Sequence, residues 1–220
     1  MYPPEPDNKP QFTEKYNQTY SRFAWSYDWI VKVLPIWQNW ISSVVPYIIG
    51  PNVLEVSFGT GYLISQYANQ YNTFGIDYNW ELTQIAKENL KDFGARARLQ
   101  QANVEHLPYS KETFETVVNT MAFTGYPDGR KALAEISRVL KPHGRFLLVD
   151  IDYPQDNNWL GTQITRLWGL GGDILRDMDT LFKQFGFSYT RKEVGGFGSV
   201  HLYVAIKQGL EPKNETTATR

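Results

Sequence analysis

The chain has 220 residues, 42% of them hydrophobic and 20% charged, a length and balance that fit one domain with a substantial core. Its 22 lysines and arginines against 23 acidic residues, with no basic run, give no electrostatic support for a nucleic-acid partner. The absence of cysteine excludes disulfides and thiolate metal sites, and because the first residues do not resemble a signal peptide we expect a reducing, cytoplasmic setting.

The first fifty residues are rich in aromatic side chains at helical spacing. Tyr20 and Tyr27 are seven residues apart, so they would share one face of a helix. Residues 29–49 are strongly apolar, but Lys32, several polar side chains and two prolines argue against a transmembrane helix. An interfacial helix would carry a polar face rich in lysine and arginine, which this segment lacks. We therefore expect residues 1–50 to form a helical segment packed on the rest of the chain, in preference to one that contacts a membrane.

A glycine-spaced turn follows the first apolar run that is typical of a strand. Residues 53–61 hold one acidic side chain, Glu55, and end in a turn with Gly59 and Gly61, after which a helix is expected. The missing side chains at the two glycines would let a nucleotide-like ligand approach unpaired N–H groups at the helix N-terminus. A dinucleotide fingerprint would need a third small residue where Ile64 stands, so the turn favours an adenosine ligand without specifying NAD.

A second short strand is expected at residues 74–77 and ends in a carboxylate. Asp77 lies sixteen residues past Gly61, a placement at which a carboxylate can accept two hydrogen bonds from a ribose diol on a doubly wound sheet. The alternative is that Asp77 only caps the helix that follows it.

Strand and helix patterns alternate along the chain, which predicts a parallel sheet with helices on both faces. The last two strand-like runs, 188–194 and 200–206, are joined by too few residues for a crossover and so predict an antiparallel hairpin. Residues 208–220 are polar without an apolar period, and we expect a disordered tail there. The other strands are expected at about 52–57, 73–77, 97–101, 114–120 and 145–151, and helices at about 80–93, 128–140 and 173–185.

Four blocks in register between residues 53 and 150 together resemble the class I S-adenosylmethionine-dependent methyltransferases. The blocks are Val53 to Gly61, Gly75 to Asp77 with the helix Leu82 to Leu90, Ala102 to Val118, and Leu133 to Asp150. The likeness is greatest to the small-molecule branch that includes quinone and phospholipid methyltransferases. It implies a Rossmann-like, doubly wound α/β fold whose seven-stranded sheet has the order 3-2-1-4-5-7-6 with the last hairpin antiparallel. It also implies S-adenosylmethionine as cofactor and S-adenosylhomocysteine as product.

The resemblance further implies which residues hold the cofactor, with Glu55 at its methionine end and Asp77 at its ribose. The full set is Glu55, Ser57, Gly59, Gly61, Asp77, Tyr78, Asn103, Val104 and Thr120. Ser57 stands where the family usually has its first glycine, and a serine there would be strained by ~1–2 kcal/mol if its φ were positive. Asn103 replaces an aspartate, which would remove the charge from a hydrogen bond to adenine at a cost of about 1 kcal/mol.

By the same resemblance, the acceptor pocket lies between the N-terminal segment and the insert at 156–172. The aromatic residues expected to contact the acceptor are Tyr20, Tyr27, Trp159 and Trp168, for which packing on the fold is a comparable explanation. Their character predicts a small hydrophobic or aromatic acceptor, lipid-like or quinone-like. No catalytic base is assigned, and no metal site is expected. The candidate bases, each better explained by a structural role, are Asp150, Asp152, His106 and His201.

Three hypotheses from different classes remain. The leading one is a methyltransferase that moves a methyl group by direct SN2 displacement to an O, N or C atom of such an acceptor. The second is a catalytically silent cofactor-binding or scaffold protein of the same fold, and the third is a nucleotide-dependent oxidoreductase, which the missing third glycine disfavours. In the leading hypothesis residues 1–50 form a lid or substrate segment, residues 51–207 the cofactor-binding domain, and residues 208–220 the tail.

Overall fold

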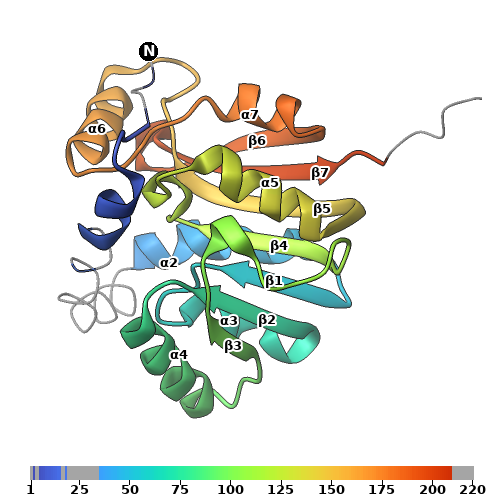
Figure 1. Cartoon of the computed structure of the whole chain (residues 1–220). Helices are drawn as coiled ribbons and strands as arrows, with labels where there is room; N and C mark the ends of the chain where they lie inside the picture. The colour runs from blue at the N-terminus through green and yellow to red at the C-terminus, as the bar shows by residue number, and fades with distance from the viewer. Residues whose placement is uncertain (1, 3–4, 16–17, 19–34, 210–220) are drawn as a thin grey trace, which may run out of the picture.

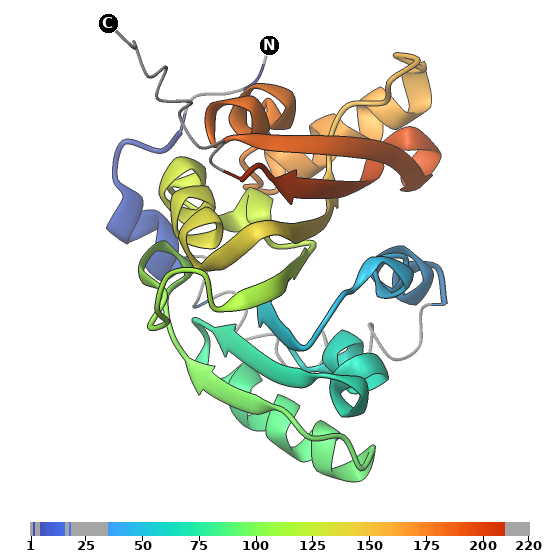
Figure 2. The ribbon, with the colours of Figure 1, turned by 90° about the vertical axis from the view of Figure 1, so that its right-hand side faces the viewer.

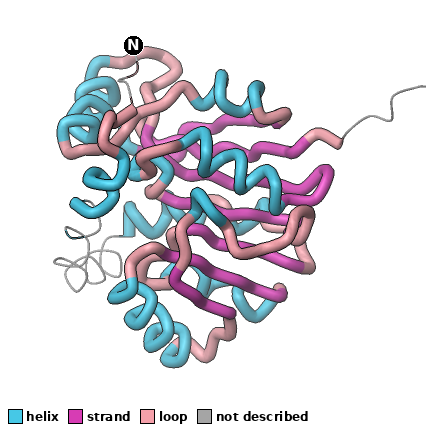
Figure 3. Tube along the Cα trace, viewed as in Figure 1, coloured by secondary structure: helices cyan, strands magenta, loops and turns pink. Residues whose placement is uncertain are grey.

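The computed structural model describes residues 2, 5–15, 18 and 35–209. Its centre is one mixed sheet of seven strands (Figure 1). The strand order is β3-β2-β1-β4-β5-β7-β6, as the family resemblance implies, with the first five strands parallel and β7 antiparallel to both of its neighbours. The strands are β1 (Asn52–Val56), β2 (Asn72–Asp77), β3 (Arg98–Gln101), β4 (Phe114–Thr120), β5 (Leu140–Ile151), β6 (Phe187–Gly195) and β7 (Val200–Lys207). Figure 3 shows these strands side by side, with helices packed around them.

Several of the helices that cover the sheet begin at a polar cap. Asn79 Oδ1 accepts a hydrogen bond from Leu82 N (2.9 Å) at the start of α4, and Asp128 Oδ1 accepts one from Lys131 N (2.9 Å) at the start of α5. The helices are α2 (Pro35–Ser42), α3 (Tyr62–Tyr67), α4 (Trp80–Asp92), α5 (Gly129–Val139), α6 (Trp159–Leu170) and α7 (Met178–Gln184).

Two helices differ from the sequence-based expectation. The helix expected from about residue 173 begins only at Met178, because Asp177 caps it by accepting a hydrogen bond from Thr180 N at 3.0 Å. Residues 159–170, expected only as an apolar insert, form α6, which Asn158 caps. In both places the capping side chain, more than the apolar spacing, decides where the helix begins.

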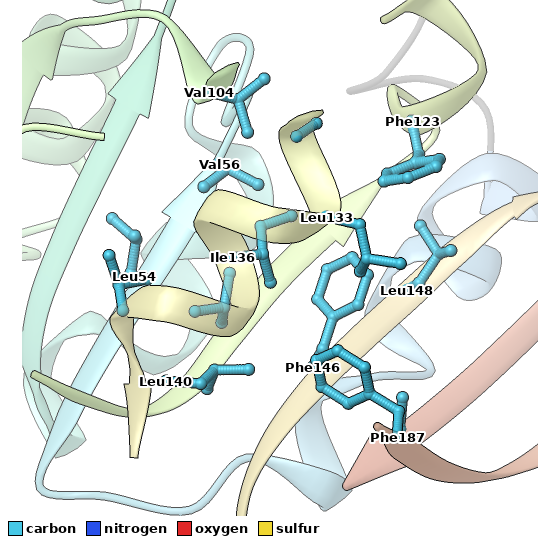
Figure 4. Packing of buried hydrophobic residues seen from close by; sticks show 14 of the residues in the cluster. Leu54, Val56, Val104, Phe123, Leu133, Ile136, Leu140, Phe146, Leu148 and Phe187 are labelled. Carbon is cyan, nitrogen blue, oxygen red and sulfur yellow. The ribbon is translucent and has the colours of Figure 1, made fainter. Parts of the chain in front are cut away.

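Side chains alternate between two cores on opposite faces of the sheet. Leu54 belongs to the core formed with α5 and α7, whereas its neighbour Val53 belongs to the core formed with α2 and α3. Figure 2 shows these two pairs of helices on the two sides of the sheet. In the first core, Leu133 of α5 and Phe146 of β5 point into the same space (Figure 4). Both faces are therefore covered, as a doubly wound sheet requires.

The carboxyl ends of the parallel strands meet at one edge of the sheet. Ser57 follows β1, Asp77 ends β2, Ala102 follows β3 and Thr120 ends β4. Ligands of open α/β sheets bind at this edge. The fold thus brings together residues that lie up to 63 positions apart along the chain.

The structure describes part of the first fifty residues. Residues 9–15 are helical, and α2 lies shortly before β1. Tyr20, Tyr27 and residues 210–220, which carry three of the sequence-based expectations, lie outside the described residues. Within the described ranges, no helix combines the length and the apolar character needed to cross a membrane.

Candidate functional site

A pocket lies at the carboxyl edge of the sheet, built from the turns that follow β1, β2, β3 and β4. Its walls are Thr13, Ser57, Gly59, Asp77, Tyr78, Asn79, Leu82, Ala102, Asn103, Val104, Glu105, Thr120, Met121, Ala122, Gly125, Tyr126 and Pro127. A second, smaller pocket shares Ser57, Gly59 and Thr120 with it and reaches Glu55 and Trp37. The two pockets therefore form one elongated site, with a junction at Ser57.

The turn after β1 has the backbone that a close ligand needs. Gly59 and Gly61 have φ values of 57° and 78°, in the left-handed region that favours glycine. A Cβ on Gly61 would lie 3.1 Å from the Cβ of Ala86 in α4, so a larger residue would also push the turn from its helix. Ser57 has a φ of 56°, so the strain of ~1–2 kcal/mol foreseen for a serine there is present.

Asp77 is held in place by backbone donors. Its carboxylate accepts hydrogen bonds from Gly59 N (2.9 Å) and Asn79 N (2.8 Å) and is almost completely buried. Burial raises the pKa of Asp77 to about 6, although the backbone N–H groups act in the opposite direction. Asn79, not Asp77, caps α4, so the capping alternative for Asp77 is wrong.

The end of the pocket beyond Asp77 is suited to a flat nucleobase such as adenine. Val104 is buried and Tyr78 is half-exposed, and both line the pocket beside Leu82 of α4. Asn103 Oδ1 accepts a hydrogen bond from Glu105 N (2.8 Å), so this side chain organises its own short 3-10 turn at the pocket wall. Here the structure brings the residues expected near adenine to one wall.

Glu55 lies at the opposite end, inside the second pocket. It is 1% exposed, and Tyr67 of α3 donates a hydrogen bond from Oη to its carboxyl group at 2.5 Å. Burial raises the pKa of Glu55 to about 8; the Tyr67 hydrogen bond lowers it, and the negative charge of Asp77 raises it further. A buried carboxyl group of this kind would be relieved by a cationic ligand.

These residues fit S-adenosylmethionine. Asp77 lines the main pocket, Gly59 lines both pockets, and the buried acid Glu55 lines the second pocket, so a carboxylate lies at each side of the glycine turn. A cationic ligand would compensate the burial of the Glu55 carboxyl group, which Tyr67 alone contacts by a side-chain hydrogen bond among the described residues. All the expected cofactor residues except Gly61 line at least one of the two pockets; Gly61 lies in the turn after β1 and lines neither.

The residues expected to contact the acceptor are distributed differently. Trp159, at the start of α6, is 74% exposed and lines neither pocket. Trp168 is half-buried, and its ring centre lies 6.3 Å from that of Trp37, which lines the second pocket. The structure therefore brings Trp168, but not Trp159, next to the site.

Two of the candidate bases, Asp150 and Asp152, take part in structural hydrogen bonds. Asp150 accepts hydrogen bonds from Thr124 N (3.0 Å) and Thr124 Oγ1 (3.1 Å), and burial raises its pKa to about 7. Asp152 accepts one from Tyr203 Oη at 2.6 Å, and His201 is fully buried. Asp150, Asp152, His106 and His201 line neither pocket. Among the residues that the structure describes, no group of three or more histidine, aspartate or glutamate side chains could hold a metal ion.

An ion-pair network ties the N-terminal segment to the turn before α5. Lys9 Nζ lies 2.6 Å from Asp128 Oδ2, and Glu5 Oε1 lies 3.3 Å from Arg176 Nε. Arg176 also donates to the carbonyl oxygen of Tyr126, which lines the pocket. Because Thr13 lines the same pocket, this network holds residues 5–15 against the site.

Replacing Lys9 by alanine should loosen that segment and raise the dissociation constant for S-adenosylhomocysteine by about 1.4- to fivefold, which corresponds to the ~0.2–1 kcal/mol of a partly exposed ion pair. Titration calorimetry at low salt measures this. The difference should shrink at about 0.5 M NaCl, where the wild-type pair is screened. Lys111→Ala, an exposed lysine in the turn before β4, is the matched control and should change nothing. Equal effects of the two substitutions would exclude a role for the ion pair.

Two hydroxyl groups that contact side chains of the site, those of Tyr67 and Tyr126, were not expected from the sequence. Tyr67 continues the apolar stripe of α3 with Leu63 and Ile64. Only its hydroxyl group could have indicated, from the sequence, that it contacts a buried polar group. Tyr126 follows the fourth strand at the ligand edge, a position that could have marked it. The Tyr67 hydroxyl contacts Glu55, 12 residues earlier in the chain, and the Tyr126 hydroxyl contacts Ser57, 69 residues earlier, and both contacts follow only from the packing.

Comparisons with known proteins agree with this geometry. Residues 54–148 match a family model described as a methyltransferase domain. A ubiquinone/menaquinone biosynthesis C-methyltransferase, UbiE, of Geotalea uraniireducens is 26% identical over 213 residues, which cover 91% of this chain and 89% of the relative. The UbiE protein of Haemophilus ducreyi is 30% identical over 190 residues, covering 74% of this chain and 72% of the relative. An S-adenosylmethionine-dependent methyltransferase structure from Thermotoga maritima has the same fold, with a TM-score of 0.71 at 15% identity over 88% of this chain and 100% of the other.

Proposed function

Because the chain belongs to the class I S-adenosylmethionine-dependent methyltransferases and resembles the quinone C-methyltransferases among them, we propose that it methylates a ring carbon of a small, apolar, quinone-like acceptor. It is an enzyme whose methyl donor is S-adenosylmethionine. The observation that carries the proposed acceptor is the extent of the similarity. The alignment with the Geotalea quinone methyltransferase covers 91% of the chain, so it is not confined to the cofactor-binding core.

The residues at the carboxyl edge have the chemistry that this cofactor needs. When bound, S-adenosylmethionine supplies a methyl group that its sulfonium makes electrophilic. Asp77 would accept hydrogen bonds from the ribose hydroxyls, Glu55 would face the positively charged methionine end, and Val104 would pack against adenine. The turn at 57–61 would let the ligand pass close to the backbone between these ends.

The acceptor side is supported by apolar walls near the junction of the two pockets. Met121 and Ala122 follow β4, and Trp37 of α2 packs against Trp168 of α6. Such walls exclude water and hold an aromatic ring in line with the methyl group, which is the main requirement of direct displacement. Tyr20 and Tyr27 stay predictions as further acceptor contacts.

We expect the purified protein, given S-adenosylmethionine, to convert a demethylated short-chain benzoquinol or naphthoquinol to its C-methylated product. Each turnover replaces one ring hydrogen, released as a proton to the buffer, by the methyl group, so mass spectrometry should find one S-adenosylhomocysteine for each methylated ring. A catechol and an aromatic amine of similar size serve as comparators for oxygen and nitrogen acceptors. Methylation of oxygen or nitrogen alone would refute the carbon assignment. Binding of S-adenosylhomocysteine without turnover of any acceptor would favour a silent cofactor-binding protein.

A further inference from the structure

Three hydrogen-bonding side chains meet where the two pockets join. Asn119 lies near the end of β4, Tyr126 lies after the short 3-10 turn that follows β4, and Ser57 follows β1. Tyr126 Oη lies 2.7 Å from both Asn119 Nδ2 and Ser57 Oγ. Tyr126 and Ser57 line the main pocket, and Ser57 lines the second pocket as well.

The hydrogens of this cluster can be assigned by counting donors and acceptors. Asn119 Nδ2 carries two hydrogens, one donated to the carbonyl oxygen of Val56 (3.1 Å) and the other to Tyr126 Oη. Tyr126 is therefore an acceptor towards Asn119, and its own hydroxyl hydrogen remains to be donated. Burial raises the pKa of Tyr126, so the phenol keeps this hydrogen at neutral pH. Ser57 Oγ is the acceptor within reach.

This assignment leaves the hydroxyl hydrogen of Ser57 without an acceptor in the cluster, because Asn119 Oδ1, the remaining acceptor, makes no hydrogen bond to it. Ser57 Oγ receives the hydrogen of Tyr126, so its own hydrogen is directed elsewhere, and Ser57 lines both pockets. The position has a positive φ, which would favour glycine, and the structure keeps a serine there despite the strain. A hydroxyl group that contacts the ligand would account for that choice.

We propose that the Ser57 hydroxyl donates a hydrogen bond to an oxygen of the bound cofactor, and that Tyr126, itself fixed by Asn119, is the positioning residue that aims it. The inference deepens the proposed function, because it rests on the same cofactor site. Ser57 is strained where glycine would not be, but it supplies a hydroxyl donor with a fixed direction. Tyr126 couples the turn after β4 to the turn after β1, so that both walls of the pocket are held by one phenol.

The test is a double-mutant cycle read by titration calorimetry with S-adenosylhomocysteine. Ser57→Ala should weaken binding about tenfold, the factor that one lost hydrogen bond typically gives. Tyr126→Phe should weaken it by a similar factor in the wild type but by less than about threefold in the Ser57→Ala background, because the donor it aims is then gone. Tyr109→Phe removes a hydroxyl that bonds Gln100 outside both pockets, and this matched control should bind as the wild type does.

Thermal unfolding of each variant separates a structural role from positioning. If Tyr126 were purely structural, Tyr126→Phe would lower the melting temperature by the same amount, and the affinity by the same factor, in the wild type and in the Ser57→Ala background. That result would overturn the proposal. Ser57→Gly provides a second variant, which relieves the backbone strain; it should be at least as stable as the wild type and yet bind more weakly. Unchanged affinity in Ser57→Gly and Ser57→Ala would also overturn it.

The test of the Ser57–Tyr126 pair and the test of the proposed acceptor can fail independently. Coupling between Ser57 and Tyr126 without methylation of any quinol would support the inference and contradict the proposed acceptor. Tight binding with independent effects of the two substitutions would contradict the inference and leave the acceptor proposal intact. A wild-type protein that does not bind S-adenosylhomocysteine would contradict both.

Discussion

Replacing Asp77 by asparagine is expected to weaken S-adenosylhomocysteine binding at least about 100-fold. The carboxylate accepts hydrogen bonds from Gly59 N and Asn79 N and, in the proposed complex, from the ribose hydroxyls. An asparagine of the same size would turn an NH2 group towards one of these donors. Hydrogen bonds to charged groups are each worth about 1.5–3 kcal/mol, so losing two of them gives an effect of this size. Titration calorimetry with purified wild-type and variant protein measures it.

Asp92→Asn is the matched control for this substitution. Asp92 is the last residue of α4 and is exposed, so the same chemical change there should leave the affinity unchanged. Because Asn79 and not Asp77 caps α4, the helix should persist in Asp77→Asn, and far-ultraviolet circular dichroism should match the wild type. Retention of affinity within threefold in Asp77→Asn would show that the carboxylate does not hold the ligand.

The second large effect is a dependence of cofactor affinity on pH. Burial raises the pKa of Glu55 to about 8, so the free protein holds this carboxyl group protonated through most of the range below that pH. Facing a cationic ammonium, the carboxyl group is more favourable ionised, so binding at lower pH must first release a proton. The dissociation constant for S-adenosylhomocysteine is therefore expected to rise by up to about tenfold per pH unit as the pH falls from 8 to 6.5. Calorimetry in buffers of different ionisation enthalpy should also detect the released proton.

Glu55→Gln removes this titration and provides the control. The variant should bind weakly, with an affinity that is nearly constant over the same pH range. The sign for stability is opposite to that for binding. The native state holds a proton on Glu55 between the ordinary pKa of 4.5 and about 8, whereas the unfolded chain has lost it, so the free energy of unfolding falls as the pH rises through that window.

Two measurements would contradict this account of Glu55. The first is a wild-type affinity that does not change between pH 6.5 and 8. The second is a free energy of unfolding that falls with pH as steeply in Glu55→Gln as in the wild type. Below pH 6.5 the pKa of Asp77, raised to about 6, would add its own loss of affinity, so the comparison belongs above that pH.

The fold was predictable because its signals are local. Each strand is a short apolar run between turn residues, and the hairpin of β6 and β7 follows from the few residues that join them. The glycine turn at Gly59 and the carboxylate of Asp77 were also predictable, because each lies directly after a strand whose carboxyl end must reach the ligand edge. The helix α6 was missed, because its apolar residues face solvent as well as the core and its cap at Asn158 was not considered.

The sequence by itself determined the order of the elements and an adenosine-type ligand at the carboxyl edge, since strand pattern, turn chemistry and spacing are written in contiguous residues, and its family resemblance indicated the cofactor. Only the tertiary structure decided which side chains meet. It placed Tyr67 on Glu55, Tyr126 on Ser57 and Trp168 near the pocket, and it left Trp159 outside. These contacts join residues from different elements, and the burial that shifts the pKa of Glu55 comes from the packing of all of them. Neither the partner of a buried hydroxyl nor the loss of water around a carboxyl group is encoded in its neighbours along the chain.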